Sequence, residues 1–348
     1  MKRSKKIAFL LVIQMPVQIV IGYFIGFNYF SLLMVFVAIP IADQILGHDA
    51  SNPPAEEVAA LQSDWFFLIM PVLWVPCQLA ILVWGAWLIQ SDMLPLWQKI
   101  GLGLSIAVMS GSGIIIAHEF GHRNSWWERA LAKILLATVC YMHFIIEHNH
   151  GHHLRVATPE DPSSARQGEN FYMFWLRSVG GSYASAWRLE LTRLRHNHYS
   201  AWGWHNQMLW FLLIPVGIAA AAYFFLGLYA LIFFLAQSFF AFSMLELINY
   251  IEHYGLERQK TAQGGYEPVS VRHSWNANQL LSNLYMIHLE RHSDHHHNPL
   301  LRYQVLNHRE ESPQLPGGYG AMFPLALVPP LWFRIIDPLV EKYRRAAP

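Results

Sequence analysis

Six long apolar segments are the feature that most limits how this chain can fold. They lie at about 7–26, 28–47, 65–90, 99–118, 207–226 and 228–252. A helix needs about 20 apolar residues to cross the hydrocarbon core of a bilayer, and each segment is close to that length. The sequence therefore predicts an all-α, multi-pass membrane protein with six transmembrane helices.

The low charge content agrees with this interpretation. Of the 348 residues, 54% are apolar and only 14% are charged, whereas an ordinary soluble domain has about 25% charged residues. Much of the surface is therefore expected to face lipid, and residues 1–348 are expected to form one membrane domain with polar insertions. The net charge of +1 gives no reason to expect a nucleic acid partner.

The turns between the segments predict how they pair and which way they face. Short turns near Gly26–Asn28, Ser91–Gln98 and Gly227 join the six segments into three helical hairpins. Of the 24 lysines and arginines, only Lys99 lies near one of these turns. Because basic residues concentrate on the cytoplasmic side of membrane proteins, both termini are expected in the cytoplasm.

The remaining chain is expected to form a cytoplasmic or interfacial helical cap, made of residues 119–206 and 253–348. The apolar stretches 131–146 and 323–336 within it are expected not to cross the membrane. The N-terminal "MKRSKK" is followed by an apolar run that is longer than the roughly 7–15 residues of a signal peptide. It is therefore interpreted as an uncleaved first span.

Eleven of the nineteen histidines are grouped in four segments, "HEFGH", "EHNHGHH", "NYIEHYG" and "RHSDHHH". The first is an H-E-x-x-H motif, His118 to His122, which on a helix is typical of zinc peptidases. Catalytic zinc takes about three protein ligands and a water, however, and all four segments are expected on the same side of the membrane. The count of histidines therefore favours two metal ions, although imidazole suits zinc, copper, iron and nickel alike.

Helical spacing selects which of these histidines can face a common metal. Histidines three or four residues apart share a helix face, and a bent helix end could turn His153 inward as well. His150 lies about 160° around the helix from His152 and should point away. The candidate ligands are His118, His122, His148, His152, His153, His253, His292, His295 and His296.

Four acidic residues adjoin the candidate ligands and are expected to orient them. Metal-bound histidines commonly donate their second ring N–H to a carboxylate. The candidates for this role are Glu119, Glu147, Glu252 and Asp294, although solvation of helix ends explains each of them equally well.

Together the four histidine segments resemble the integral-membrane alkane monooxygenases of the AlkB type, which are relatives of xylene monooxygenase and, more distantly, of membrane fatty-acid desaturases and hydroxylases. The resemblance covers nearly the whole chain. Two departures are Phe120 and Arg123, where family members often have Leu and Lys, and His297 extends the last histidine segment. The resemblance implies that the nine candidate histidines bind two iron ions in a non-haem di-iron site on the cytoplasmic cap.

The same resemblance implies an activity, a location and a partner. The activity is O2-dependent terminal hydroxylation of n-alkanes to 1-alkanols in the bacterial inner membrane, with electrons from rubredoxin and its reductase. Rubredoxin iron needs four cysteines, and this chain has only Cys77 and Cys140, so the donor is expected to be a separate protein or a domain outside this sequence. The basic stretch 188–195 is a candidate docking surface for an acidic donor.

Alkanes partition into lipid, so a substrate channel that opens to the bilayer is expected. Ile114 lies one helical turn before His118, and Asn249 one turn before His253. Both are candidate channel residues, and ordinary packing of small residues between membrane helices is the alternative.

Three other functions remain open. A membrane fatty-acyl desaturase or hydroxylase, or a xylene-type methyl monooxygenase, would use the same histidines. An intramembrane zinc metalloprotease would use only the "HEFGH" motif. A metal transporter would place its ligands near the middle of the membrane, whereas these histidines lie at the ends of the predicted spans.

Overall fold

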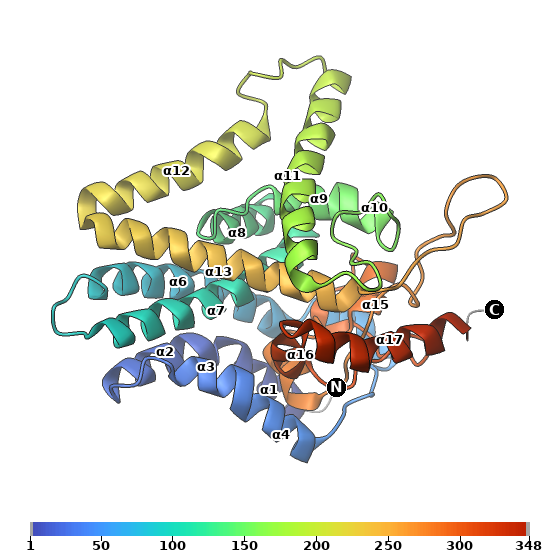
Figure 1. Ribbon diagram of the computed structural model, residues 1–348, viewed down its shortest axis with the longest axis horizontal. Helices are drawn as coiled ribbons and strands as arrows, with labels where there is room; N and C mark the ends of the chain where they lie inside the picture. The colour runs from blue at the N-terminus through green and yellow to red at the C-terminus, as the bar shows by residue number, and fades with distance from the viewer. Residues whose placement is uncertain (1–2, 346–348) are drawn as a thin grey trace.

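The computed structural model describes residues 3–345 of the chain (Figure 1). Within this range the regular structure is helical, and strand pairing is limited to isolated bridges such as the one between His48 and Gln279. The prediction of an all-α protein is therefore confirmed.

Five helical segments are long and apolar enough to cross a membrane. They are Lys6–Phe24, which includes η1 (Phe9–Ile13) and α2 (Gln14–Phe24), and the helices α6 (Trp65–Leu88), α7 (Leu96–Gly121), α12 (Gln207–Leu226) and α13 (Leu228–His253). The chain is thus a membrane protein, as its composition predicts.

The predicted span at 28–47 is shorter in the structure. It is a helix over Phe30–Leu46, formed by α3 (Phe30–Leu33), the π-helical turn η2 (Met34–Ala38) and α4 (Ile39–Leu46). Its 17 residues rise about 26 Å, which is less than the roughly 30 Å of a bilayer core. Five spans rather than six therefore meet the length requirement in the described part of the chain.

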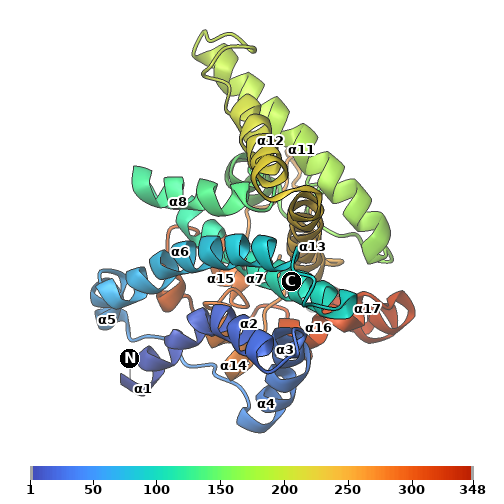
Figure 2. The same ribbon diagram turned by 90° about the vertical axis from the view of Figure 1, so that its left-hand side faces the viewer.

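The long helices run between two ends of the molecule (Figures 1 and 2). The turns that join α2 to α3, α6 to α7 and α12 to α13 lie at one end. Gly227 forms the α12–α13 turn with φ of 87°, a left-handed conformation that glycine adopts without a steric penalty. We call this the turn end of the molecule.

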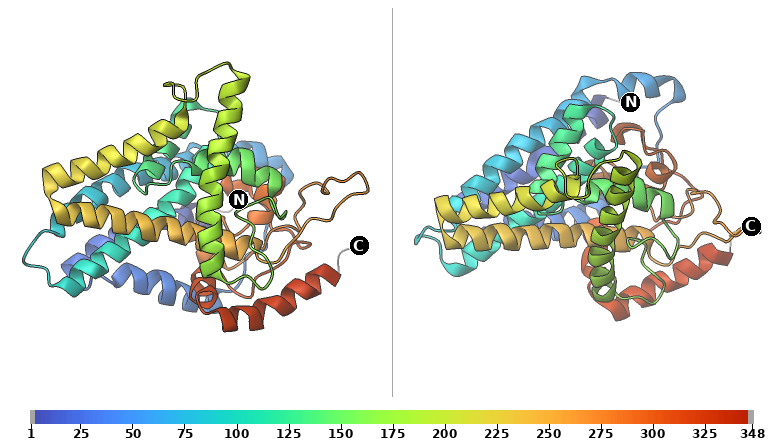
Figure 3. Two further views of the ribbon diagram at one scale, coloured as in Figure 1. Left: turned by 45° about the horizontal axis from the view of Figure 1, so that its top comes forward. Right: turned by 90° about the horizontal axis from the view of Figure 1, so that it is seen from above.

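Shorter helices and loops gather at the opposite end, which we call the cap. Its elements before α12 are α5 (Ala55–Gln62), α8 (Trp126–Ala137), α9 (Phe144–Glu147), the π-helical turn η3 (His148–His152), α10 (His153–Arg155) and α11 (Phe171–His196). Those after α13 are α14 (Leu280–Tyr285), α15 (His292–His297), η4 (Tyr303–Val305), α16 (Tyr319–Ala326) and α17 (Pro329–Arg345). Helix α11 runs across α12 and α13 rather than along them (Figures 1 and 3).

Helix α7 is at the centre of the bundle, where it packs against α2, α6, α8 and α13. Small residues allow these close contacts. A Cβ atom at Gly85 of α6 would collide with Ile106 of α7, and one at Gly113 would collide with Gln78 of α6. This packing fixes the axial position of α7, and therefore the position of the histidines at its end.

Candidate metal centre

The nine candidate ligands come together at the cap from four segments that lie far apart in the sequence. Helix α7 brings His118 and, as its C-cap residue, His122, and α13 brings His253. The turn η3 and the start of α10 bring His148, His152 and His153, and the short helix α15 brings His292, His295 and His296. These rings form two adjacent groups, which we call the first and second histidine clusters.

The first cluster contains five imidazoles, those of His118, His122, His148, His153 and His295. Their Nε2 atoms form a closed ring. Each Nε2 atom lies 3.0–3.2 Å from the next one around the ring. The order around the ring is His118, His295, His153, His148, His122 and back to His118.

Hydrogen bonds alone cannot satisfy this ring of five. A ring nitrogen of a neutral imidazole either donates a hydrogen or offers a lone pair, so donors and acceptors would have to alternate around the ring. Five atoms cannot alternate in a closed ring, and at least one pair must therefore be mismatched. A single cation that accepts all five lone pairs removes the mismatch.

The second cluster contains His152, His253, His292 and His296. The Nε2 of His296 lies 3.2 Å from that of His152 and 2.9 Å from that of His292, and the His292 Nε2 lies 3.2 Å from that of His253. Glu252 adds an oxygen to this group, because its Oε2 lies 3.1 Å from the His292 Nε2. The hydroxyl of Tyr319 donates to the other oxygen, Oε1, over 2.8 Å.

The spacing of the nitrogens fits metal coordination. An imidazole nitrogen lies about 2.0–2.1 Å from a bound ion such as zinc, so two ligands at right angles lie about 3 Å apart. The observed distances of 2.9–3.2 Å in both clusters match this value.

The electrostatics of the clusters also suit a cation. Burial lowers the pKa of several of the imidazoles well below the ordinary histidine value, which keeps their lone pairs free at neutral pH. This applies to His148, His153, His292, His295 and His296.

The π-helical turn η3 explains how neighbouring histidines reach different clusters. The backbone N–H of His153 donates to the carbonyl of His148, the five-residue step of a π turn, and both rings lie in the first cluster. His152 lies between them in this register and faces the second cluster. His150 is exposed on the far side of the turn, as predicted from helical spacing, and His297 is exposed at the end of α15.

Gly151 gives this turn the space it needs. A Cβ atom at position 151 would overlap the side chains of Glu147 and Arg155. These two side chains form an ion pair of 2.6 Å that bridges the turn. Only glycine fits between them without displacing one of the partners.

Asp161 orients a histidine of the second cluster, and sequence reasoning missed it. Its Oδ2 lies 2.8 Å from the Nδ1 of His152, and both side chains are buried. Ser164 donates to the same oxygen over 2.7 Å. Burial by itself would lower the pKa of His152, but the Asp161 carboxylate raises it overall. Asp161 lies in an irregular loop, where helical periodicity gives no signal.

Three of the four acidic residues named from the sequence form ion pairs with arginines. Glu119 pairs with Arg123, Glu147 with Arg155, and Asp294 with Arg309, at 2.6–2.7 Å. These pairs hold the histidine-bearing elements to each other and to nearby loops. Glu252, the fourth, contacts the Nε2 of His292 rather than its second nitrogen, Nδ1.

The position of Glu119 also weighs against a zinc peptidase. In such an enzyme the glutamate of the motif must face the metal-bound water as general base. Here Arg123 holds Glu119 by a hydrogen bond to its Oε1, and Arg123 also donates to the carbonyls of Leu300 and Leu301. The carboxylate is therefore committed to anchoring the loop after α15.

A narrow apolar cavity of about 30 Å³ lies on the bundle side of the clusters. Residues that line it include Gly111, Ser112, Ile115, Met244, Ile248 and Phe323. The channel candidates Ile114 and Asn249 are the immediate neighbours of two of these residues. Ile114 is fully buried, and the Asn249 amide lies 3.5 Å from Glu246.

Comparisons with known proteins give the chain's relatives. Residues 95–326, which contain all nine histidines, match the family model described as fatty acid desaturase. Alkane 1-monooxygenase 2 of Pseudomonas aeruginosa is 42% identical over 89% of this chain and 83% of its own length. Alkane 1-monooxygenase of Acinetobacter baylyi is 39% identical, over 90% and 77%. The hydroxylase component XylM of a Pseudomonas putida xylene/toluene monooxygenase is 27% identical, over 91% and 84%.

Proposed function

This chain belongs to the fatty acid desaturase family of membrane proteins and, within it, to the alkane 1-monooxygenases, and we propose that it converts n-alkanes to 1-alkanols with a pair of iron ions. The reaction consumes one alkane, one O2, two electrons and two protons, and it releases one 1-alkanol and one water. The observation that supports this function best is the pair of adjacent imidazole clusters at the cap ends of apolar helices.

Each histidine cluster is proposed to hold one iron. The ligands of one iron are His118, His122, His148, His153 and His295, and those of the other are His152, His253, His292 and His296. When bound, the reduced irons supply the activation of O2 that the reaction requires. Metal-free imidazoles could not do this, because histidine side chains carry no redox chemistry of their own.

The protein itself is proposed to orient the metal ligands and to keep water away from the reacting groups. Asp161 holds the His152 ring in one orientation through the 2.8 Å contact at Nδ1, as outer carboxylates do in many metal sites. The apolar walls of the 30 Å³ cavity exclude water beside the clusters. Ile115 and Ile248, which line it, lie within about 5–8 Å of His118 and His253 along their helices. We place the alkane there, with its terminal methyl toward the clusters.

The present cavity is about the volume of one water molecule, so an alkane must displace some of its walls. Met244 of α13 and Phe323 of α16 are two rotatable side chains that line the cavity. Movement of these side chains would open a path from the lipid.

The remaining features of the enzyme are proposed from its family and its charge pattern. Residues 1–348 act as one domain in the bacterial inner membrane, with the cap, both termini and the metal site in the cytoplasm. Phe30–Leu46, although shorter than the five long spans, is proposed as a sixth crossing because it leads the chain from the turn end back to the cap (Figure 1). A rubredoxin, reduced by its reductase, delivers the electrons.

Two measurements on the purified protein test this function. Metal analysis should give about two irons per chain, and the protein supplied with rubredoxin, its reductase and NADH should convert octane to 1-octanol. One zinc per chain with peptide cleavage would overturn the proposal in favour of a metalloprotease. Metal flux in proteoliposomes without oxidation of octane would overturn it in favour of a transporter.

The family model and the similarity to XylM favour a second candidate, oxidation of a fatty acyl chain or of an aromatic methyl group. Octane, a fatty acid and xylene should therefore be offered in parallel. Faster turnover of the fatty acid or of xylene than of any n-alkane would replace the alkane by that substrate.

A further inference from the structure

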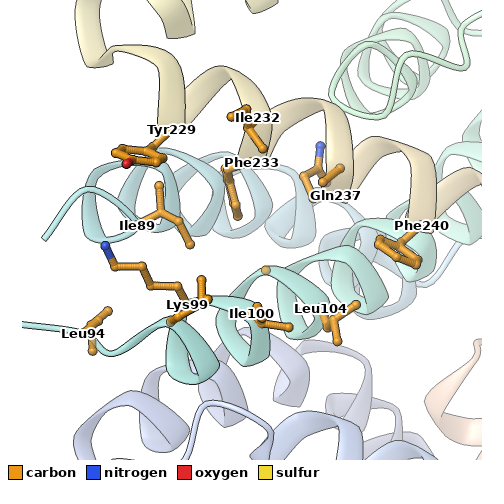
Figure 4. Close-up of a pocket in the computed structure, with 13 residues that line it drawn as sticks. Ile89, Leu94, Lys99, Ile100, Leu104, Tyr229, Ile232, Phe233, Gln237 and Phe240 are labelled. Carbon is orange, nitrogen blue, oxygen red and sulfur yellow. The ribbon is translucent and has the colours of Figure 1, made fainter. Parts of the chain in front are cut away.

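A second apolar groove lies far from the metal site, at the turn end of the molecule (Figure 4). It has a volume of about 510 Å³ and is formed by α7, α13 and the connection between α6 and α7. Ile89, Ile100, Gly103, Ile232 and Phe240 are among its lining residues. Gly103 lies fifteen residues before His118 on α7, about 22 Å along the helix, so this groove is separate from the substrate cavity.

The length of the groove matches one leaflet of a bilayer. Its lining on α13 extends from Tyr229 to Phe240, eleven residue steps that rise about 16 Å. Half of a hydrocarbon core is about 15 Å. Tyr229 and Leu228 begin α13 at the turn, so the groove starts at the membrane surface and ends near the middle of the bilayer.

A single cation stands at the surface end of the groove. Lys99 is the only lysine or arginine between residues 7 and 122. Its Nζ lies 5.8 Å from the centroid of the Tyr229 ring, and Figure 4 shows the amine beside that ring at the mouth of the groove. Within the described residues Lys99 forms no ion pair with a carboxylate. A charged amine at the membrane surface with no carboxylate partner is suited to bind the phosphate group of a lipid.

We propose that this groove binds a phospholipid of the leaflet at the turn end, with one acyl chain between α7 and α13 and its phosphate against Lys99. An amphiphile of this kind satisfies both ends of the groove at once, since its chain covers the apolar wall and its anionic group neutralises the amine. An alkane would cover the apolar wall but could not neutralise the charge of the Lys99 amine. The bound lipid would close the gap between α7 and α13, the two helices that carry His118 and His253.

A neighbouring surface offers a comparison. The groove between α6 and the end of α12 has a volume of about 590 Å³, and its lining residues, which include Val83, Trp87 and Leu226, carry no charge. It can hold acyl chains but has no partner for a phosphate. Selectivity for an anionic lipid should therefore belong to the Lys99 groove alone.

Native mass spectrometry of the purified full-length protein tests the proposal, with phosphatidylglycerol and phosphatidylcholine added in turn. The wild type should retain one phosphatidylglycerol through detergent exchange. Lys99→Gln should lower its affinity about five-fold, the effect of one basic residue near an anionic lipid, with a smaller change for phosphatidylcholine. Ala236→Trp, which fills the groove from an exposed position on α13, should abolish retention of both lipids.

Val83→Trp, which fills the uncharged groove, is the matched control and should bind phosphatidylglycerol as the wild type does. Unfolding temperatures equal to that of the wild type establish that the variants are folded. Equal retention of phosphatidylglycerol by the wild type and Lys99→Gln would overturn the proposal. So would retention of dodecane, rather than phospholipid, that Ala236→Trp removes.

Discussion

Asp161 is the residue whose role is easiest to isolate. It contacts a single proposed ligand, His152, through the nitrogen that faces away from the cluster. Asp161→Asn keeps the size of the side chain but removes its charge. Loss of such an outer carboxylate typically costs 10- to 100-fold in metal affinity or activity. We therefore expect one of the two iron sites to need about 10- to 100-fold more iron to become half occupied. Titration of the metal-free protein with ferrous iron measures this.

Glu160→Gln is the control for this substitution, because Glu160 is the adjacent residue and is exposed. It should leave iron binding unchanged. Equal iron affinity in Asp161→Asn and the wild type would show that the contact with His152 serves only folding.

The histidines could be predicted from the sequence and their supporting residues could not. Spacings such as that of His118 and His122 repeat with the helix, so the sequence alone places both on one face. Asp161 reaches His152 through a loop of irregular backbone, and no periodicity encodes that path. Glu119 is adjacent to His118, but adjacency on a helix separates side chains by about 100°, which is why it pairs with Arg123 instead.

Among the elements, the π-helical turn η3 carries the most specific geometry. Gly151→Ala would push a Cβ into the Glu147–Arg155 pair and shift the register in which His148 and His153 face the first cluster. We expect loss of at least one iron per chain and a hydroxylase activity reduced at least 10-fold, the lower limit for a displaced outer partner of a metal site. Iron analysis and octane turnover measure these effects.

Gly180→Ala on α11 is the matched control, because a Cβ at Gly180 meets no neighbouring atom. Alanine there should stabilise the helix by about 0.4–1 kcal/mol and leave the iron content at the wild-type level. A normal iron content in Gly151→Ala would contradict the role given to η3.

The cavity beside the clusters predicts that residues of α7 limit the length of the alkane that the enzyme accepts. Gly111 lines the cavity seven residues before His118, about 10 Å along the helix. A Cβ there makes only ordinary contacts, 3.4 Å from the carbonyl oxygen of Ala241, so Gly111→Ala should keep the wild-type product range. Gly111→Leu projects into the cavity and should lower turnover of long alkanes at least 10-fold more than that of short ones.

Competition between hexane and dodecane, with both 1-alkanols measured by gas chromatography, gives this ratio directly. An unchanged ratio in Gly111→Leu would move the alkane site away from this cavity. The sequence-based candidates on the same helices, Ile114→Phe and Asn249→Leu, belong in the same experiment, since they differ from the cavity-lining residues by one position.

The helices themselves were largely predictable, with one clear exception. The length of the apolar segments predicted α6, α7, α12 and α13 to within a few residues, because a run of about 20 apolar residues has few stable structures in a membrane other than a spanning helix. It overestimated the segment at 28–47, where the π-helical turn η2 and the break after Leu46 leave a helix over Phe30–Leu46. Apolar content cannot report such local changes of backbone geometry.

At the scale of the whole molecule, the two ends of the bundle differ in charge. Lys99 is the single basic residue near the turn end, whereas the cap contains the histidine clusters and the arginines of α8 and α11. This asymmetry supports our proposal that the cap lies in the cytoplasm, on the side of the proposed soluble electron donor.

A groove on the cap surface marks where that donor should dock. It has a volume of about 440 Å³ and is lined by residues that include Arg129, His150, Arg193 and His196. His150 belongs to the turn η3, whose other face carries His148 and His152. A donor in this groove is therefore separated from both histidine clusters by the thickness of one helical turn.

Arg129 is the residue through which this docking can be tested. It is exposed and forms no ion pair within residues 3–345, whereas Arg193 is held by Glu190 at 2.7 Å. Arg129→Gln should raise the KM for an acidic rubredoxin by up to about five-fold at low ionic strength, the upper range for one exposed ion pair. The difference should disappear near 1 M salt, where the Debye length falls to about 3 Å, and kcat at saturating donor should not change.

Arg334→Gln, at an exposed arginine on α17, is the control and should behave as the wild type at every salt concentration. If Arg129→Gln and Arg334→Gln show the same KM and the same salt dependence, the donor binds elsewhere on the cap, and the exposed arginines of residues 188–195 become the next surface to test.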